Sequence, residues 1–166
     1  MKIILPFLVA VIFTIGCVKK DQTCGYADST LVAAPAEIQQ LRDSLDLYGI
    51  TAIQHASGFF YKINAQGSGT GIANLCTAIA VTYKGQFFNG KIFDSTKAGT
   101  MANFQLGEVI ASWQKGVPLV SKGGDIDLYI PPSLGYGPNP VRDNLGNIVV
   151  PPNSYLKFNV HIVEIQ

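Results

Sequence analysis

The chain has 166 residues, which is enough for one ordinary domain and too few for two comfortable ones. Its 12 basic and 11 acidic residues nearly cancel, which excludes the strongly basic surface that binds nucleic acid or an anionic membrane. The apolar content of 48% is typical of a globular protein, although the first segment raises it.

The N-terminus has the pattern of an export signal. Lys2 is followed by an apolar run over residues 3–15 and then by Gly16 and Cys17. The run is too short for a comfortable membrane span and fits the apolar region of a secretory signal. A cysteine directly after a small residue resembles the lipobox of bacterial lipoproteins, although Thr14 stands where that motif more often has Leu. On this resemblance residues 1–16 are a cleaved signal peptide and Cys17 carries a lipid. The alternatives are an uncleaved anchor or an ordinary cleavage site a few residues away.

Cys24 and Cys76 are the two further cysteines. An exported chain meets an oxidising compartment, which favours a disulfide between them over two free thiols. Such a bond closes a long loop, for which the chain-entropy relation gives about 4 kcal/mol, and it attaches the N-terminal extension to the main domain. Zinc is the weaker alternative because neither cysteine has a close Cys or His neighbour in the sequence, and we predict no metal site.

Residues 17–57 are predicted to be a lipidated tether that contains one short helix. The helix begins at Pro35, which suits a first helical position, and stops at Gly49. Its apolar positions follow helical spacing and are Ile38, Leu41, Leu45 and Tyr48. A helix of about three turns is not stable alone. It therefore packs on the domain or on a partner copy, which leaves both a monomer and a dimer open.

The main domain is expected over residues 58–166. Apolar or alternating runs between turn formers predict its strands. These strands are expected at residues 59–64, 78–88, 125–130 and 155–165, with a short strand that ends at residues 104–107 and a return strand that ends at Ser95. Asn89 and Gly90 predict a tight hairpin before that return strand, because both central positions of such a turn need positive φ. Residues 133–147 predict a long loop, which in a compact domain is often functional.

One short internal helix is expected over residues 109–116, with Val109, Ile110 and Trp113 on one face. Alternation in the strands favours an antiparallel sheet that is covered on one face, and this helix is the natural cover. The fold class is therefore α+β: an antiparallel half-barrel of about five to six strands wrapped on one short helix, with an N-terminal helical extension.

The charged and catalytic residue types form no hydrolytic constellation. His55 and His161 are far apart in the sequence, and His161 alternates with the core face of its strand. Asp125 and Asp127 project to the same side of a strand, where a solvated face is the favoured interpretation. The glycines of residues 67–71 lack the Gly-Lys-Ser/Thr of a phosphate loop. The remaining candidate for a functional site is an apolar pocket with few polar groups.

Six blocks in this region resemble the FKBP-type peptidyl-prolyl cis-trans isomerases, and they occur in the family's order. The blocks are Val-Thr-Tyr-Lys-Gly (81–85), Gly-Lys-Ile-Phe-Asp-Ser (90–95), Phe-Gln-Leu-Gly (104–107), Val-Ile-Ala-Ser-Trp-Gln-Lys-Gly (109–116), Ile-Pro-Pro-Ser-Leu-Gly-Tyr-Gly (130–137) and Val-Pro-Pro-Asn-Ser (150–154). The resemblance covers roughly residues 58–166 and implies the FKBP fold. With its lipobox and helical extension as well, the chain resembles exported lipoproteins of the Bacteroidetes type.

The resemblance also implies the site. The residues it implies to be catalytic are Tyr83, Phe93, Asp94 and Tyr136. The residues it implies to bind substrate are Phe104, Val109, Ile110, Trp113, Val150 and Phe158. Trp113 would form the floor, the Ile110 amide and the Tyr136 hydroxyl would contact substrate, and Val150 stands where the family usually has Ile. Ala102 occupies a position where many members have an aromatic wall residue, and the loop after Gly137 is longer than in the smallest members.

The implied function is isomerisation of X–Pro bonds without a cofactor, in proline-containing exported polypeptides. The implied location is the cell envelope, where the N-terminal lipid would anchor the protein in a membrane. One alternative keeps the fold without catalysis: a lipid-tethered binding module or chaperone for proline-containing segments. The open rim at Ala102 and the long loop allow that alternative. A weaker alternative is a purely structural envelope protein.

Overall fold

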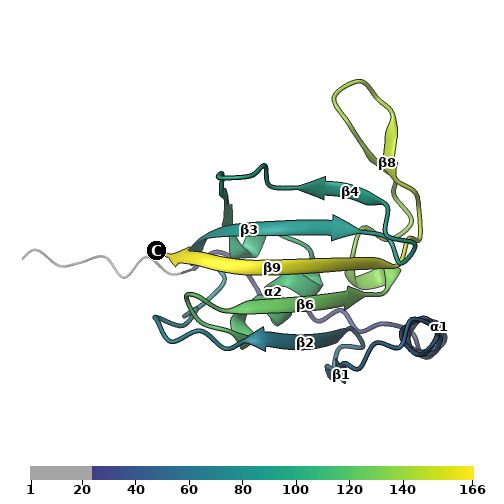
Figure 1. Ribbon diagram of the computed structural model, residues 1–166, viewed down its shortest axis with the longest axis horizontal. Helices are drawn as coiled ribbons and strands as arrows, with labels where there is room; N and C mark the ends of the chain where they lie inside the picture. The colour runs from purple at the N-terminus through teal and green to yellow at the C-terminus, as the bar shows by residue number, and fades with distance from the viewer. Residues whose placement is uncertain (1–23) are drawn as a thin grey trace, which may run out of the picture.

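The computed structural model describes residues 24–166, so the predicted signal peptide and Cys17 lie outside the described residues. The centre of the molecule is an antiparallel sheet with the strand order β1-β2-β6-β9-β3-β4 (Figure 1). Strand β5 also pairs with β3, along the same edge as β4 but at the other end. The strands are β1 Ile53–Gln54, β2 Phe60–Ala65, β3 Ala78–Gln86, β4 Ile92–Ser95, β5 Ala102–Gln105, β6 Asp125–Ile130 and β9 Leu156–Ile165.

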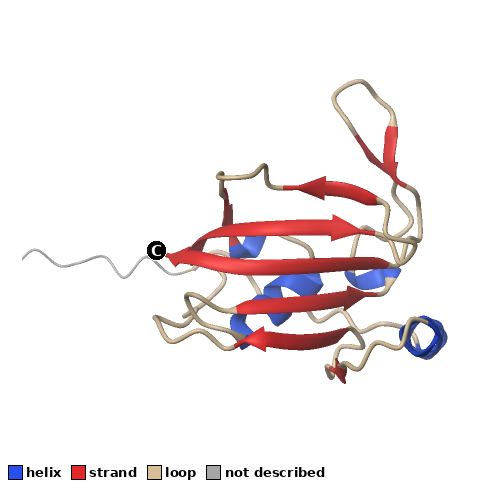
Figure 2. Cartoon of the chain, viewed as in Figure 1, coloured by secondary structure: helices blue, strands red, loops and turns tan. Residues whose placement is uncertain are grey.

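The short helix α2 (Ala111–Gly116) lies against one face of this sheet (Figure 2). The alternation predicted for the last strand is confirmed, because every second side chain of β9 is buried between the sheet and the helix: Leu156, Phe158, Val160 and Ile162. The predicted α+β half-barrel on a short helix is therefore confirmed. The sheet has seven strands rather than five to six, and the two-residue β1 lies ahead of the boundary expected at residue 58.

The N-terminal helix α1 (Pro35–Leu47) begins at the predicted proline, and Gly49 follows it with φ +61°. Leu41 and Leu45 are buried against Phe60 and Tyr129, which pair directly across β2 and β6. These two aromatic side chains alternate with residues of the main core, so α1 covers part of the outer face of the sheet. The sequence left open whether this helix packs on its own domain or on a partner copy, and in the structure it packs on its own domain.

The turn at Asn89 and Gly90 differs from the prediction. Only Gly90 has positive φ (+85°), and Asn89 is not in the left-handed region. The Gly90 N–H donates to the Phe87 carbonyl, and the Phe87 N–H donates to the Lys91 carbonyl. These bonds define a three-residue hairpin loop in which glycine supplies the one left-handed position.

Two further expectations were wrong in detail. The loop over residues 133–147 begins with a 3-10 turn, η3 (Pro132–Leu134), and then enters a small hairpin of β7 (Val141–Arg142) and β8 (Ile148–Val150) that projects beyond the sheet (Figure 1). Val109 and Ile110 precede α2 in extended conformation instead of belonging to it. The 3-10 turns η1 (Leu106–Glu108) and η2 (Val117–Leu119) flank this region.

The segment before α1, residues 24–34, forms an arm along the domain, which we call the N-terminal arm. Cys24 is joined to Cys76 by a disulfide with a Cα–Cα distance of 5.5 Å. Near its other end the arm buries Ala33, whose N–H donates to the Ser57 carbonyl. Both ends of the arm are therefore held against the domain. Within residues 24–166 no helix has the length and apolar character needed to cross a membrane.

Candidate functional site

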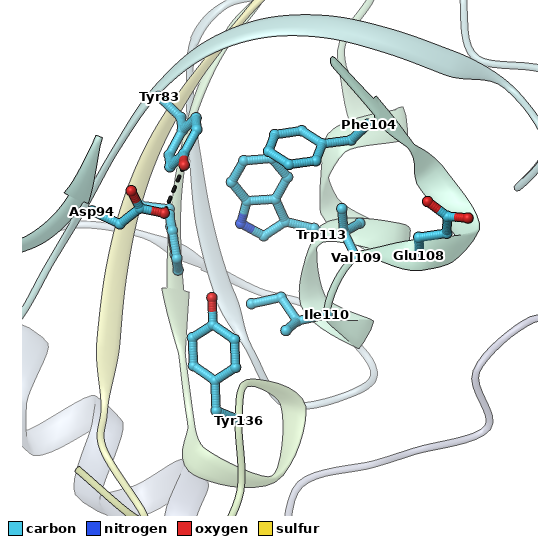
Figure 3. Close-up of a pocket in the computed structure, with 9 residues that line it drawn as sticks. Tyr83, Asp94, Phe104, Glu108, Val109, Ile110, Trp113 and Tyr136 are labelled. Atoms are coloured by element: carbon cyan, nitrogen blue, oxygen red, sulfur yellow. Dashed lines mark hydrogen bonds between the residues drawn. The ribbon is translucent and has the colours of Figure 1, made fainter. Parts of the chain in front are cut away.

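A cavity of about 220 Å³ opens between α2 and the inner face of the sheet. Nine residues line it: Tyr83, Asp94, Phe104, Glu108, Val109, Ile110, Trp113, Tyr136 and Phe158 (Figure 3). They come from β3, β4, β5, η1, α2, β9 and the connections beside them, so the fold gathers them from widely separated parts of the chain. Pockets that enclose a drug-sized ligand are typically about 300–1,000 Å³, so this smaller cavity suits a single ring or side chain rather than a length of extended chain.

The floor of the cavity is aromatic. Trp113, only 3% exposed, meets three neighbouring rings edge to face, with centroid distances of 5.6 Å to Tyr83, 5.8 Å to Phe104 and 5.3 Å to Phe158. Aromatic rings prefer this arrangement, and each contact of this kind restricts how the rings can tilt. The Trp113 indole N–H is buried and has no hydrogen-bond partner among residues 24–166. The floor is therefore rigid and apolar, with one free donor.

One edge of the cavity is polar. The Tyr83 hydroxyl donates to the Asp94 carboxylate over 2.6 Å (dashed line in Figure 3). Burial raises the pKa of Tyr83, and the hydrogen bond to Asp94 raises it further. Burial and then the negative charge of Asp94 also raise the pKa of Tyr136. Both phenols are thus neutral hydroxyls at physiological pH and can donate hydrogen bonds.

Among residues 24–166, those that line the cavity include no thiol, amine or aliphatic hydroxyl. Covalent catalysis would have to use a carboxylate or a phenol. The Asp94 carboxylate already accepts the Tyr83 hydrogen bond, and the raised pKa values of Tyr83 and Tyr136 keep both phenols protonated. The arrangement is instead suited to holding an apolar ring over Trp113 while the groups beside that ring meet hydrogen-bond donors. A cavity of this kind can change the conformation of what it binds without forming a bond to it.

The sequence profile of the family described as FKBP-type peptidyl-prolyl cis-trans isomerase matches residues 71–163, and this range contains every residue that lines the cavity. The chain belongs to this family.

Individual proteins are also similar to this chain. The "Probable FKBP-type peptidyl-prolyl cis-trans isomerase" of Haemophilus influenzae is 41% identical over 110 residues, which are 66% of this chain and 43% of that protein. The "Outer membrane protein MIP" of Legionella longbeachae is 35% identical over 111 residues, 66% of this chain and 45% of that protein. The crystal structure of FkpA from Escherichia coli superposes with a TM-score of 0.66 at 28% identity, covering 79% of this chain and 60% of that one. The chain spans less than half the length of these two curated relatives.

Most of the residues predicted for an FKBP site line the cavity, and two do not. Phe93 lies outside the lining and packs edge-on against Phe158, with ring centroids 5.4 Å apart. Val150 is 1% exposed and belongs to the hydrophobic core, on β8. Ala102 also lies outside the lining, on β5 opposite Val81.

The FKBP cavity has a lip, residues 107–110, that sequence reasoning only partly anticipated. Ile110 ends it, and the Ile110 N–H donates to no group within residues 24–166. The Gln114 side chain holds the lip by donating to the carbonyls of Gly107 (3.2 Å) and Val109 (2.8 Å). Glu108 lines the cavity and was not predicted, because a lone glutamate between two motif blocks has no distinguishing pattern.

The two aspartates of β6 have no part in the FKBP cavity. The Asn159 side-chain amide donates to both Asp125 (2.9 Å) and Asp127 (3.0 Å), and His161 lies 4.0 Å from Asp125. Neither aspartate lines the cavity. Because both accept hydrogen bonds from Asn159, they belong to a hydrogen-bonded polar face of the sheet and are not simply solvated side chains. Residues 24–166 contain no cluster of three or more side chains that could hold a metal ion.

Proposed function

We propose that this chain is a peptidyl-prolyl cis-trans isomerase that acts on X–Pro bonds of exported proteins. One observation carries the proposal: an apolar aromatic floor at Trp113 lies beside a polar edge made by the Tyr83–Asp94 hydrogen bond. Membership of the FKBP family supports the same activity.

The proposed mechanism follows from the electronic structure of the amide. Rotation about the X–Pro bond has a barrier of about 18–20 kcal/mol because resonance gives the C–N bond partial double-bond character. In the planar amide the same resonance places negative charge on the oxygen. An apolar cavity disfavours this charge separation and so binds the twisted amide more tightly than either planar isomer. The barrier falls without a covalent intermediate or a cofactor, for a reaction that takes tens to hundreds of seconds unaided.

Each side chain then has a proposed role. Trp113 supports the prolyl ring, and Phe104, Val109 and Phe158 enclose it. The Ile110 N–H and the Tyr136 hydroxyl donate hydrogen bonds to the peptide on either side of the proline. Tyr83 orients Asp94 at the edge where the amide twists. Phe93 and Val150 act indirectly, through the packing behind the wall.

We also infer that the protein is exported and anchored in the cell envelope. The proposed division is a signal peptide over residues 1–16, a lipidated tether with α1 over residues 17–57, and an FKBP domain over residues 58–166. The apolar run before Cys17 supports this division, as does the disulfide, which suits an oxidising compartment. The name of the Legionella relative refers to the outer membrane. The assignment to the Bacteroidetes type rests on the leader and the helical extension alone.

The activity is tested by measuring the cis-to-trans rate of a short X–Pro peptide with the full chain, beside two tyrosine variants. Tyr83→Phe removes the hydroxyl that orients Asp94, while Tyr155→Phe removes a hydroxyl that bonds Gln40 of α1, away from the cavity. Hydrogen bonds to charged groups contribute about 1.5–3 kcal/mol, and the lower value applies here because Asp94 is exposed. A loss of about 1.5 kcal/mol corresponds to a factor of about ten, so kcat/KM should fall about tenfold in Tyr83→Phe. Tyr155→Phe should match the wild type.

Equal loss of activity in the two variants would contradict the role of the Tyr83–Asp94 pair. A folded wild-type chain that binds prolyl peptides without accelerating their exchange would support the binding-module alternative. The anchor is tested separately by incorporation of a labelled fatty acid into cells that express the wild type or Cys17→Ser. Label retained in the variant would contradict lipidation at Cys17.

A further inference from the structure

The N-terminal arm reaches the lip of the cavity through Tyr26. A Cβ atom added at Gly107 would lie 2.2 Å from the Tyr26 ring, so the ring lies directly on the backbone of the lip. The Tyr26 hydroxyl donates to the Glu108 carboxylate over 2.8 Å, and this bond raises the pKa of Tyr26. The ring contact and the hydrogen bond together fix the position of a carboxylate that lines the cavity.

The arm and the lip are anchored to the same piece of chain. Cys24, two residues before Tyr26, is bonded to Cys76. The Cys76 carbonyl accepts from the Gln105 side chain (3.1 Å), and the Gly107 N–H donates to the Leu75 carbonyl (2.7 Å). The disulfide therefore keeps Tyr26 close to the lip, because the arm is bonded to Cys76 and the lip is hydrogen-bonded to Leu75.

The cavity has an acidic rim. Of the part of the chain that the structure describes, Asp94 and Glu108 are the charged residues in the lining, and no lysine, arginine or histidine from that part lines it. In Figure 3 the two carboxylates lie on opposite sides of the aromatic floor, with Glu108 beyond Val109. Tyr26 is a neutral donor, so it positions Glu108 without cancelling its charge. Both carboxylates line the cavity whose floor is Trp113, so a residue next to a ring bound on that floor would lie toward one of them.

Building on the proposed function, we propose that Tyr26 positions Glu108 so that the rim selects X–Pro segments with a lysine or arginine immediately beside the proline. Tyr26 is a positioning residue and Glu108 a specificity-determining one. A solvent-accessible ion pair contributes a modest, salt-screened free energy. The preference is therefore a factor of about two to five, and it disappears at high salt. Because the charge is attracted equally in the planar and twisted states of the amide, the preference lies in KM and not in kcat.

The experiment compares matched peptides that carry Lys or Gln directly before, or directly after, one proline. Exchange rates are measured by NMR with the full chain in the wild type and in Glu108→Gln, Tyr26→Phe and Glu164→Gln. Glu164 pairs with Lys122 on the surface and does not line the cavity, so its variant controls for net charge. Thermal melts verify that each variant is folded. Trp113 is the only tryptophan, so quenching of its fluorescence gives the affinity of each peptide independently of catalysis.

We expect a Lys-over-Gln ratio above two at low salt in the wild type and in Glu164→Gln, at one of the two positions. We expect a ratio near one in Glu108→Gln and an intermediate ratio in Tyr26→Phe, which keeps the ring but loses the hydrogen bond. A wild-type ratio of one, with both peptides isomerised, overturns this inference and leaves the proposed function standing. If the wild type isomerises neither peptide, the proposed function fails. If fluorescence then gives equal affinities for the Lys and Gln peptides, this inference is overturned as well. A preference that survives in Glu108→Gln, or that is unchanged in Tyr26→Phe, also contradicts it.

Discussion

Gly85 lies where β3 passes directly over two of the rings that shape the site. A Cβ atom at this position would be 2.7 Å from both Phe158 and Phe93, closer than real Cβ atoms approach other groups. Phe158 is 3% exposed and packs edge-on against Phe93 and Trp113, so it has little space into which to retreat. Gly85→Ala should therefore overpack the wall of the cavity.

Overpacking and strand propensity predict opposite changes in the stability of Gly85→Ala. Replacing glycine by alanine inside a strand would otherwise stabilise by about 0.5–1 kcal/mol. Overpacking a well-filled core costs about 1–3 kcal/mol. We expect Gly85→Ala to lower the free energy of unfolding by about that amount and Tm by roughly 3–10 °C. Since Phe158 lines the cavity, kcat/KM for an X–Pro peptide should fall as well.

The measurement is guanidinium unfolding of Gly85→Ala beside Gly71→Ala. Gly71 has no atom of residues 24–166 within 4 Å of the added Cβ and no positive φ, so its substitution should change stability by less than about 0.5 kcal/mol. A Gly85→Ala variant that is as stable as the wild type or more so would refute the close packing of Phe93 and Phe158 described above.

Three further predictions concern the scaffold. Replacing Cys24 and Cys76 by serine should lower the free energy of unfolding by up to about 4 kcal/mol, given the separation of 52 residues; a wild-type denaturation midpoint that a reductant leaves unchanged would contradict this. Leu41→Ala should cost about 2–5 kcal/mol because Leu41 is fully buried, whereas Leu47→Ala, at a position 80% exposed, should be nearly neutral in the same unfolding assay. Burial and then the charge of Asp127 raise the pKa of Tyr129 to about 12, above the value near 10 of an unfolded tyrosine. This contribution to stability is complete below pH 10 and is lost as the pH rises toward 12, so Tm should fall over that range; a Tm that is constant from pH 9 to 11 would contradict it.

The sequence predicted those parts of the fold where one physical rule dominates. The alternation of Leu156, Phe158 and Val160 identified a half-buried strand, because one face of the sheet is fully covered. Pro35 and Gly49 marked the ends of α1 because each has a restricted or special backbone conformation. The cavity followed from ordered family blocks rather than from periodicity.

The remaining features depend on tertiary contacts that leave no local pattern. Strands β7 and β8 have two and three residues, which is too short for alternation to be recognised. Val109 and Ile110 have helical spacing but stay extended, since the Gln114 side chain holds the lip that precedes α2. Glu108 accepts a hydrogen bond from Tyr26, which is 82 residues away in the sequence.

The disulfide at Cys24 also limits how far the domain could extend from a membrane. Seven peptide links separate Cys17 from Cys24, and a fully extended chain of that length reaches about 25 Å. Every residue after Cys24 is tied to the folded body by the bridge to Cys76 and by the arm that follows it. With a lipid on Cys17, the folded body would begin within about 25 Å of the bilayer surface, so the cavity would act close to the membrane rather than throughout the compartment.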